Sequence, residues 1–174
     1  MNQLHLYETY GKVAWLWSNS NLHKTWTIGL QSRLIIPPLM LGQYIIVNDN
    51  NNNPMAYCSW AMFDLEAEIK YILHPNSIRP NDWRSGQRMW MIDFISPFSK
   101  DYTLRIKNRL VAKYPNGYLR ALRVKQNSKT CRMLTFAGKN LSLAEANLIK
   151  TQHLQELREI LSNHPSRGIE FNLN

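Results

Sequence analysis

The sequence is poor in cysteine and has no long apolar run. Its 174 residues include only two cysteines, Cys58 and Cys131, and no CxxC pair, so we expect two reduced, buried thiols rather than a disulfide framework. No stretch reaches the ~18 apolar residues of a membrane-spanning helix. Residues 1–10 are polar and lack the basic start and apolar core of a secretion signal. We therefore expect a cytoplasmic protein without a membrane span.

Motifs that bind metals or nucleotides are also missing. The sequence has no HExxH, no P-loop, no GxGxxG and no zinc-ligand spacing. Cys58 is an alternative nucleophile, but it stands in an apolar run, residues 56–63, with no adjacent base. We therefore expect no metal and no bound cofactor.

Positive charge is concentrated in one segment. The formal net charge is +9, yet residues 1–99 hold seven basic and seven acidic residues. Residues 100–140 hold eleven Lys or Arg residues and a single acidic one, Asp101. Such a segment predicts an acidic partner, either nucleic acid or an acidic protein. Most of the Trp and Tyr residues, which would stack on nucleic-acid bases, lie outside it.

The pattern of apolar residues in the first half predicts strands and helices. Residues 43–48 and 54–63 are rich in Ile, Val, Tyr, Trp and Met and flank a short Asp/Asn run, which indicates a β-hairpin. A third strand is expected at 68–73 and a loop at 76–88. The N-terminal part is expected to be helical around residues 10–16, with a second helix near Leu22 or Trp26.

The second half predicts a βαβ unit. A buried strand at 89–95 is followed by a helix at 100–113, which Ser99 can cap, and by strands at 118–124 and 132–136. This spacing should place two parallel strands side by side. Ser142 and Glu145 form a capping box that opens an amphipathic helix ending at about Leu161. Without an internal repeat or a long linker, residues 1–174 are expected to form a single α+β domain, a mixed sheet with flanking helices.

The densest group of informative residues is at 15–26, where three tryptophans surround His23 and two serines. Imidazole titrates near neutrality, so His23 in an apolar pocket could take a proton from an amine nucleophile. The alternative is structural, with Trp15, Trp17 and Trp26 in the core and His23 as a hydrogen-bonded residue at a helix start. Composition alone leaves both interpretations open.

Asp93 is the second candidate, because apolar residues flank it on both sides in the predicted strand. A partly buried carboxylate must be paired or hydrogen-bonded. Asp93 can therefore belong to a structural salt bridge, or it can orient and charge a histidine as in acid–base–nucleophile triads. The other four histidines lie in polar or amphipathic surroundings and are expected at the surface: His5, His74, His153 and His164.

Short segments between about residue 10 and about residue 140 carry a resemblance to a known family. They are residues 11–17, 20–23, 56–61, 68–71, 83–86, 88–93, 97–98 and 120–124. In order and spacing these segments resemble the haemolysin-activating lysine acyltransferases, the activators of RTX toxins. The C-terminal helix is similar to that of the family only in type.

The resemblance implies a fold similar to the GNAT acetyltransferases, with acyl carrier protein rather than coenzyme A as the acyl donor. It implies transfer of a fatty acyl group to internal lysines of an RTX protoxin, and it is compatible with a homodimer. It makes His23 and Asp93 the essential histidine and aspartate, and Ser20 the serine near that histidine. Ser20 could accept the acyl group, donate to the oxyanion, or simply cap the helix before His23.

An acidic donor protein would account for the basic segment 100–140. Arg105, Arg120 and Arg123 are the candidate donor-binding residues. Arg120 and Arg123 are three positions apart on a predicted strand, so they should point to opposite faces. The competing functions are a basic non-catalytic module that binds nucleic acid, and a coenzyme A-dependent GNAT enzyme. The latter usually has a glycine-rich pyrophosphate loop, and residues 96–101 contain no glycine.

Overall fold

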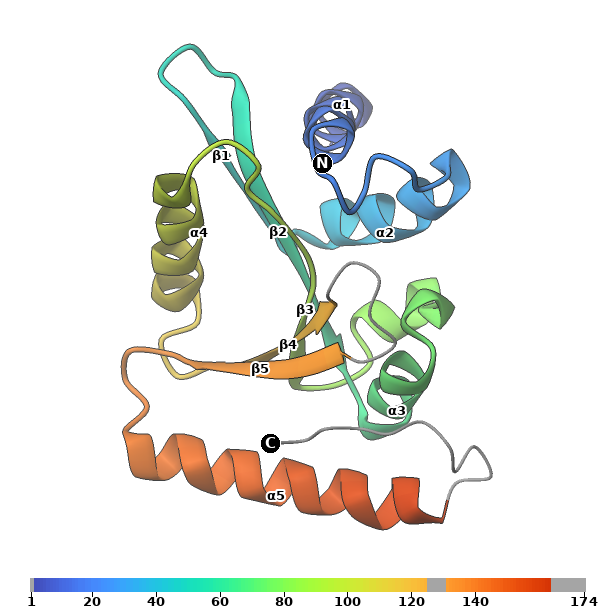
Figure 1. The fold of residues 1–174 in the computed structure, drawn as a ribbon, viewed down its shortest axis with the longest axis vertical. Coiled ribbons are helices and arrows are strands. Elements are labelled where there is room, and N and C mark those ends of the chain that lie inside the picture. The colour runs from blue at the N-terminus through green and yellow to red at the C-terminus, as the bar shows by residue number, and fades with distance from the viewer. Residues whose placement is uncertain (1, 125–130, 164–174) are drawn as a thin grey trace.

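The computed structural model describes residues 2–124 and 131–163 (Figure 1). The helices are α1 (Gln3–Ser18), α2 (Ile28–Leu41), α3 (Leu65–Leu73), α4 (Lys100–Lys113) and α5 (Leu143–Ser162). The strands are β1 (Tyr44–Asn48), β2 (Pro54–Phe63), β3 (Arg88–Ile95), β4 (Tyr118–Val124) and β5 (Cys131–Ala137). Two short 3-10 helices, Pro75–Ser77 and Pro80–Trp83, lie between α3 and β3.

Most of the predicted elements are confirmed. The β-hairpin forms β1 and β2, the βαβ unit forms β3, α4 and β4, and the side chain of Ser99 caps α4. The capping box at Ser142 and Glu145 opens α5. The helix around residues 10–16 is real but longer, because α1 begins at an Asn2 cap, and the second helix begins later than expected, at a Thr27 cap.

The strand predicted at 68–73 is wrong, because these residues belong to α3. Asp64 caps this helix by accepting a hydrogen bond from the backbone N–H of Ala67, and two glutamates stand in its first turn. The buried residues Ala67, Glu68, Tyr71 and Ile72 recur at helical spacing on one face. The cap and this spacing outweigh the β propensity of a short run that contains Ile and Tyr.

The five strands form one mixed sheet in the order β1-β2-β3-β4-β5. All neighbouring pairs are antiparallel except β3 and β4, which are parallel. The parallel pairing is short and spans only residues 89–91 of β3 and 119–121 of β4. Beyond this point the two strands separate. The α+β class is confirmed, and the arrangement is consistent with a GNAT-like fold.

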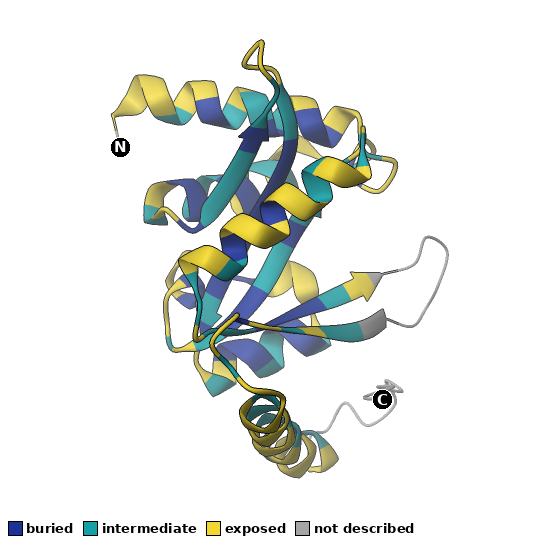
Figure 2. Ribbon diagram, turned by 90° about the vertical axis from the view of Figure 1, so that its left-hand side faces the viewer, coloured by how far each residue is buried: buried dark blue, intermediate teal, exposed yellow. Residues whose placement is uncertain are grey.

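Helices cover both faces of the sheet. The helix α4 packs mainly on β1 and β2 on one face, with Ile106 and Leu110 buried against Val47 and Trp60. On the other face α1, α2, α3 and α5 contribute to a larger apolar cluster. Figure 1 shows α4 and α5 on opposite sides of the β4–β5 hairpin, and Figure 2 shows that their outer faces are exposed.

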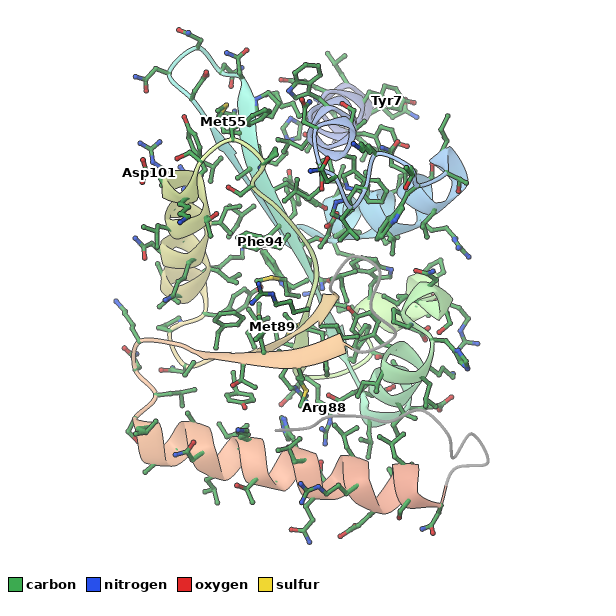
Figure 3. The ribbon with its side chains drawn as sticks, viewed as in Figure 1. Tyr7, Met55, Arg88, Met89, Phe94 and Asp101 are labelled. Atoms are coloured by element: carbon green, nitrogen blue, oxygen red, sulfur yellow. The ribbon has the colours of Figure 1, made fainter. Side chains whose placement is uncertain are left out.

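A β-bulge in β3 changes which face its side chains occupy. Trp60 of β2 pairs with Met91, but the preceding residue, Ser59, pairs with Asp93, so Ile92 is the extra residue. Before the bulge, Met91 packs with the α4-side cluster, and after it Phe94 does so. Phe94 points from β3 toward α4 (Figure 3). The bulge thus turns Asp93 to the face that carries α1 and α2.

Candidate active site

Ser20, His23 and Asp93 form one hydrogen-bonded line. The Ser20 Oγ lies 2.6 Å from Nδ1 of His23, and Nε2 of His23 lies 3.0 Å from Oδ1 of Asp93. Both His23 and Asp93 are buried. Because an ionised carboxylate can only accept, Nε2 carries a proton that it donates to Asp93. In the neutral ring, Nδ1 then accepts a hydrogen bond from the Ser20 hydroxyl.

The connection between α1 and α2 positions Ser20 and His23. The backbone N–H of His23 donates to the carbonyl of Ser20 at 3.1 Å, and that of Trp26 donates to the carbonyl of His23 at 2.9 Å. These consecutive tight turns bring the Ser20 hydroxyl back onto the imidazole ring. The Ser20 side chain therefore contacts the histidine, whereas Thr27 provides the cap of the following helix.

Tryptophans hold both members of the His23–Asp93 pair. The indole Nε1 of Trp17 donates to Oδ2 of Asp93 at 2.8 Å. The ring centroids of Trp17 and Trp26 lie 4.9 Å and 4.7 Å from that of His23. Trp15, in contrast, is 55% exposed, so it is not a core residue. Sequence reasoning missed the polar role of Trp17, because a tryptophan at helical spacing is as readily assigned to packing.

A cavity of about 660 Å³ opens beside His23 and Asp93. On their face of the sheet it is bounded by Leu22, Trp26 and Leu34. It continues to the α4 face, where side chains of α4, β4 and β5 line it. The cavity reaches from one face of the sheet to the other where β3 and β4 are no longer paired, beyond Met91 and Ala121. The walls are predominantly apolar, and such a site suits a substrate with a long hydrocarbon part.

Arg120 is buried, whereas contact with an acidic donor protein would require an exposed side chain. Its side chain forms an ion pair with buried Glu68 and stacks 4.9 Å above the ring of Trp90. Burial lowers the pKa of Arg120 to about 10, against the opposing effect of Glu68. Arg88 joins the same cluster by pairing with Glu68 and with Glu156 of α5. Arg120 therefore ties the sheet to α3, which corrects its assignment to donor binding.

The other two candidate donor-binding arginines are exposed. Arg123 lies on the opposite face of β4 from Arg120, as the three-residue spacing predicts, and it lines the cavity together with Lys107 of α4. Arg105 is exposed on α4, with its guanidinium 5.3 Å from the ring centroid of Tyr102. The structure thus brings Arg123 and Lys107 to the cavity and leaves Arg105 on the outer surface of α4.

The tyrosines of the basic segment contact the protein itself. Tyr114 packs edge-on against Trp60, with ring centroids 5.5 Å apart. Tyr118 packs against His153 of α5, and Tyr102 lies beneath Arg105. These contacts offer little aromatic surface for the stacking of nucleic-acid bases.

Cys58 and the other histidines have environments that differ from that of His23. Cys58 is buried and free, and burial raises the pKa of its thiol to about 12, so it is a thiol rather than a nucleophilic thiolate. His5 and His74 are exposed, as predicted. His153 is half-buried instead, and burial, with Arg120 and Arg88 nearby, lowers its pKa to about 4. The prediction for His164 lies outside the described residues.

Within residues 2–124 and 131–163, no group of three or more His, Cys, Asp or Glu side chains could hold a metal ion. In the same ranges, none of the helices has the length and apolarity to cross a bilayer.

Comparisons with known proteins show the family of the chain. A model of the RTX toxin acyltransferase family matches residues 2–137. The chain is 36% identical to a protein-lysine palmitoyltransferase of Bordetella bronchiseptica over 157 residues, 90% of this chain and 84% of the relative. It is 39% identical to a protein-lysine myristoyltransferase of Kingella kingae over 152 residues, 87% of this chain and 89% of the relative. It is 38% identical to an RTX-III toxin-activating lysine-acyltransferase of Actinobacillus pleuropneumoniae over 158 residues, 91% of this chain and 90% of the relative.

Proposed function

The chain belongs to the RTX toxin acyltransferase family and is an acyltransferase, and we propose that it moves a fatty acyl group from acyl carrier protein to internal lysines of an RTX protoxin. The observation that carries the proposal is the line of Ser20, His23 and Asp93 at the edge of a large apolar cavity. This arrangement supplies a base beside a space for a fatty chain. We place this activity in the cytoplasm, where acyl carrier protein is made.

The reaction needs a base more than it needs an activating group. A thioester is already activated, whereas the ε-ammonium of lysine has a reference pKa near 10.4 and must lose a proton before it attacks. His23 is the proton acceptor, and Asp93 stabilises the imidazolium that results. The amine nitrogen forms a bond to the thioester carbon, the carbon–sulfur bond breaks, and the thiol of the donor leaves with a proton.

The resting geometry constrains how the proton reaches His23. Both ring nitrogens are engaged, Nδ1 with Ser20 and Nε2 with Asp93. The Ser20 hydroxyl therefore either turns away when lysine enters or passes the proton from lysine to Nδ1. We assign Ser20 this supporting role. A nucleophilic Ser20 that carries the acyl group first is the alternative that the same hydrogen bond allows.

The tetrahedral intermediate also requires hydrogen-bond donors for its oxyanion. The bulge at Ile92 supports a position for them. Ile92 has no partner in the register of β2 with β3, and it lines the cavity next to Asp93. We propose backbone N–H groups at this bulge, or at the start of α4, as the donors.

Acyl carrier protein is acidic, and the exposed cations of α4 and β4 suit it. The nucleic-acid alternative is favoured by nothing beyond the net charge, because the tyrosines of the basic segment pack within the protein.

The decisive experiment is the intact mass of a cognate RTX protoxin after incubation with acyl carrier protein thioester and the purified protein. We expect the mass of one or more acyl groups to be added, with peptide mapping to internal lysines. Asp93→Asn is the matched negative control, since it keeps the side-chain shape and removes the charge. An unmodified protoxin, in a reaction where a characterised relative does acylate it, would contradict the proposal.

A further inference from the structure

One end of the cavity runs beneath α4, away from His23. We call this part the α4 arm, and its lining side chains are Met89, Met91, Leu110, Val111, Tyr114, Leu119, Leu134 and Phe136. We propose that the α4 arm holds the hydrocarbon tail of the acyl donor, and that Val111 and Phe136 set the chain length that the enzyme prefers. This inference rests on the proposed function.

The α4 arm belongs to the same cavity as the reactive pair, and backbone turns line its far end. Met89 and Asp93 pair with Met62 and Ser59, which are three residues apart on β2, a separation of about 10 Å along a strand. At the far end, the N–H of Gly117 donates to the carbonyl of Tyr114 at 3.0 Å, and the N–H of Gly138 donates to the carbonyl of Gly117 at 2.8 Å. These turns join the end of α4 to β4 and β5. A chain that enters beside Asp93 and follows the α4 arm would therefore run toward these turns, where Gly117 and Gly138 line the cavity.

The charged side chains of the cavity lie outside the α4 arm, which suits an acyl thioester with a polar head and an apolar tail. The charged or titratable groups of its lining are His23, Asp93, Lys107 and Arg123, apart from the tyrosines. Lys107 is seven residues before Tyr114, about 10 Å along a helix axis, and Arg123 lies beyond the last β3–β4 pair. The side chains named above for the α4 arm include none that is charged. The polar thioester and its carrier thus suit one end, and the apolar tail suits the other.

The α4 arm also has apolar side chains that the protein covers incompletely. The helix α4 packs mainly on β1 and β2, whereas α5 lies on the other side of the β4–β5 hairpin (Figure 1). As a result, Leu134 and Phe136 of β5 are only partly buried, although both face the cavity. A hydrocarbon chain between α4 and β5 would remove these side chains from water.

The test compares saturated acyl carrier protein thioesters of short, medium and long chain with one protoxin. Val111→Trp fills the α4 arm, and we expect the preferred chain to become shorter. Each methylene that loses its place should lower kcat/KM about fourfold. Phe136→Ala deepens the arm and should move the preference to longer chains. Leu104→Trp is the matched control, because Leu104 is on the same helix but 55% exposed, and it should keep the wild-type profile.

The possible outcomes separate the inference from the proposed function. If the wild type acylates no lysine with any donor, the proposed function fails. If the wild type is active but both Val111→Trp and Phe136→Ala keep its chain-length profile, the inference is overturned. It is equally overturned if Leu34→Ala, at the opposite end of the cavity, extends the preferred chain and Phe136→Ala does not. Should Val111→Trp fail to fold, the comparison of Phe136→Ala with Leu34→Ala decides.

Discussion

Asp93 and Met91 are two positions apart on β3, yet their side chains lie on opposite faces of the sheet. In a regular strand, residues two apart share a face. The extra residue at Ile92 reverses this relationship, so that Met91 lines the α4 arm while Asp93 contacts His23 and Trp17. The β3–β4 pairing also ends at Met91. A single irregularity thus coincides with both the position of the carboxylate and the opening of the cavity.

Replacing His23 with Ala should lower the rate of lysine acylation by about 10²- to 10⁴-fold, the usual contribution of a positioned acid–base group. The measurement is the initial rate of protoxin acylation, with the melting temperature recorded for the same sample. His5→Ala is the control, because His5 is exposed near the start of α1, at the opposite end of this helix from Trp17. Near-normal activity of His23→Ala in a folded protein would exclude His23 as the base.

Trp17→Phe should lower the acylation rate by about tenfold or more while the protein remains folded. The change keeps most of the aromatic packing and removes the N–H that donates to Oδ2 of Asp93. A hydrogen bond to a charged group contributes roughly 1.5–3 kcal/mol. The matched control is Trp15→Phe on the same helix, where the side chain is exposed. A positioning role should lower kcat and shift its pH profile, and if only the melting temperature changes, Trp17 serves packing alone.

Incubating the enzyme with acyl carrier protein thioester in the absence of protoxin tests the role of Ser20. A supporting Ser20 should give no acyl adduct on this residue by mass spectrometry, and Ser20→Ala should keep part of the activity. A nucleophilic Ser20 should instead accumulate an ester, which hydroxylamine would remove. Finding that ester would replace direct transfer by a two-step reaction.

Charge reversal at the exposed arginines should weaken donor binding. Arg105→Glu and Arg123→Glu are expected to raise the KM for acyl carrier protein roughly several-fold at low salt, with kcat less affected, and added salt should do the same to the wild type. Arg120→Met should behave differently. Glu68 would keep Arg88 and Trp90 as partners but lose the buried cation of Arg120, which should lower the free energy of unfolding and the melting temperature without a specific effect on KM. If the KM for acyl carrier protein changes neither with salt nor in Arg105→Glu or Arg123→Glu, the basic segment does not bind the donor protein.

The stability of the protein should depend on pH through His153. Burial lowers its folded-state pKa to about 4 from an ordinary value of 6.5, so the folded protein favours the neutral ring. The unfolded chain binds the proton more tightly, and stability should therefore fall as the pH decreases from about 6.5 to about 4. Thermal melts over this range should show a weaker pH dependence for His153→Gln than for the wild type. His74→Gln, at an exposed position, should keep the wild-type slope, and equal slopes for all three proteins would contradict the assignment.

Local signals in the sequence were sufficient to predict several helices and strands. Caps at Ser99 and Ser142, the polar run between two apolar segments, and the strand–helix–strand spacing gave β1, β2, β3, α4, β4 and α5, because hydrogen bonds to helix ends and side-chain periodicity act over a few residues. The sequence also nominated His23, Asp93 and Ser20 as candidates. The residue types and apolar surroundings of His23 and Asp93 suggested chemistry, whereas Ser20 was indicated by the family resemblance.

Which of these residues meet, and which face of the sheet each one occupies, depends on contacts between distant parts of the chain. The contact between His23 and Asp93 joins positions 70 residues apart, and it depends on a bulge at Ile92 that no periodicity reveals. The same holds for Trp17, whose N–H donates to a carboxylate only because Asp93 lies opposite it, and for Arg120, which is buried in an ion pair with Glu68. Strand register and burial are set by packing between distant segments, so a single residue's chemistry becomes a role only when its neighbours are in place.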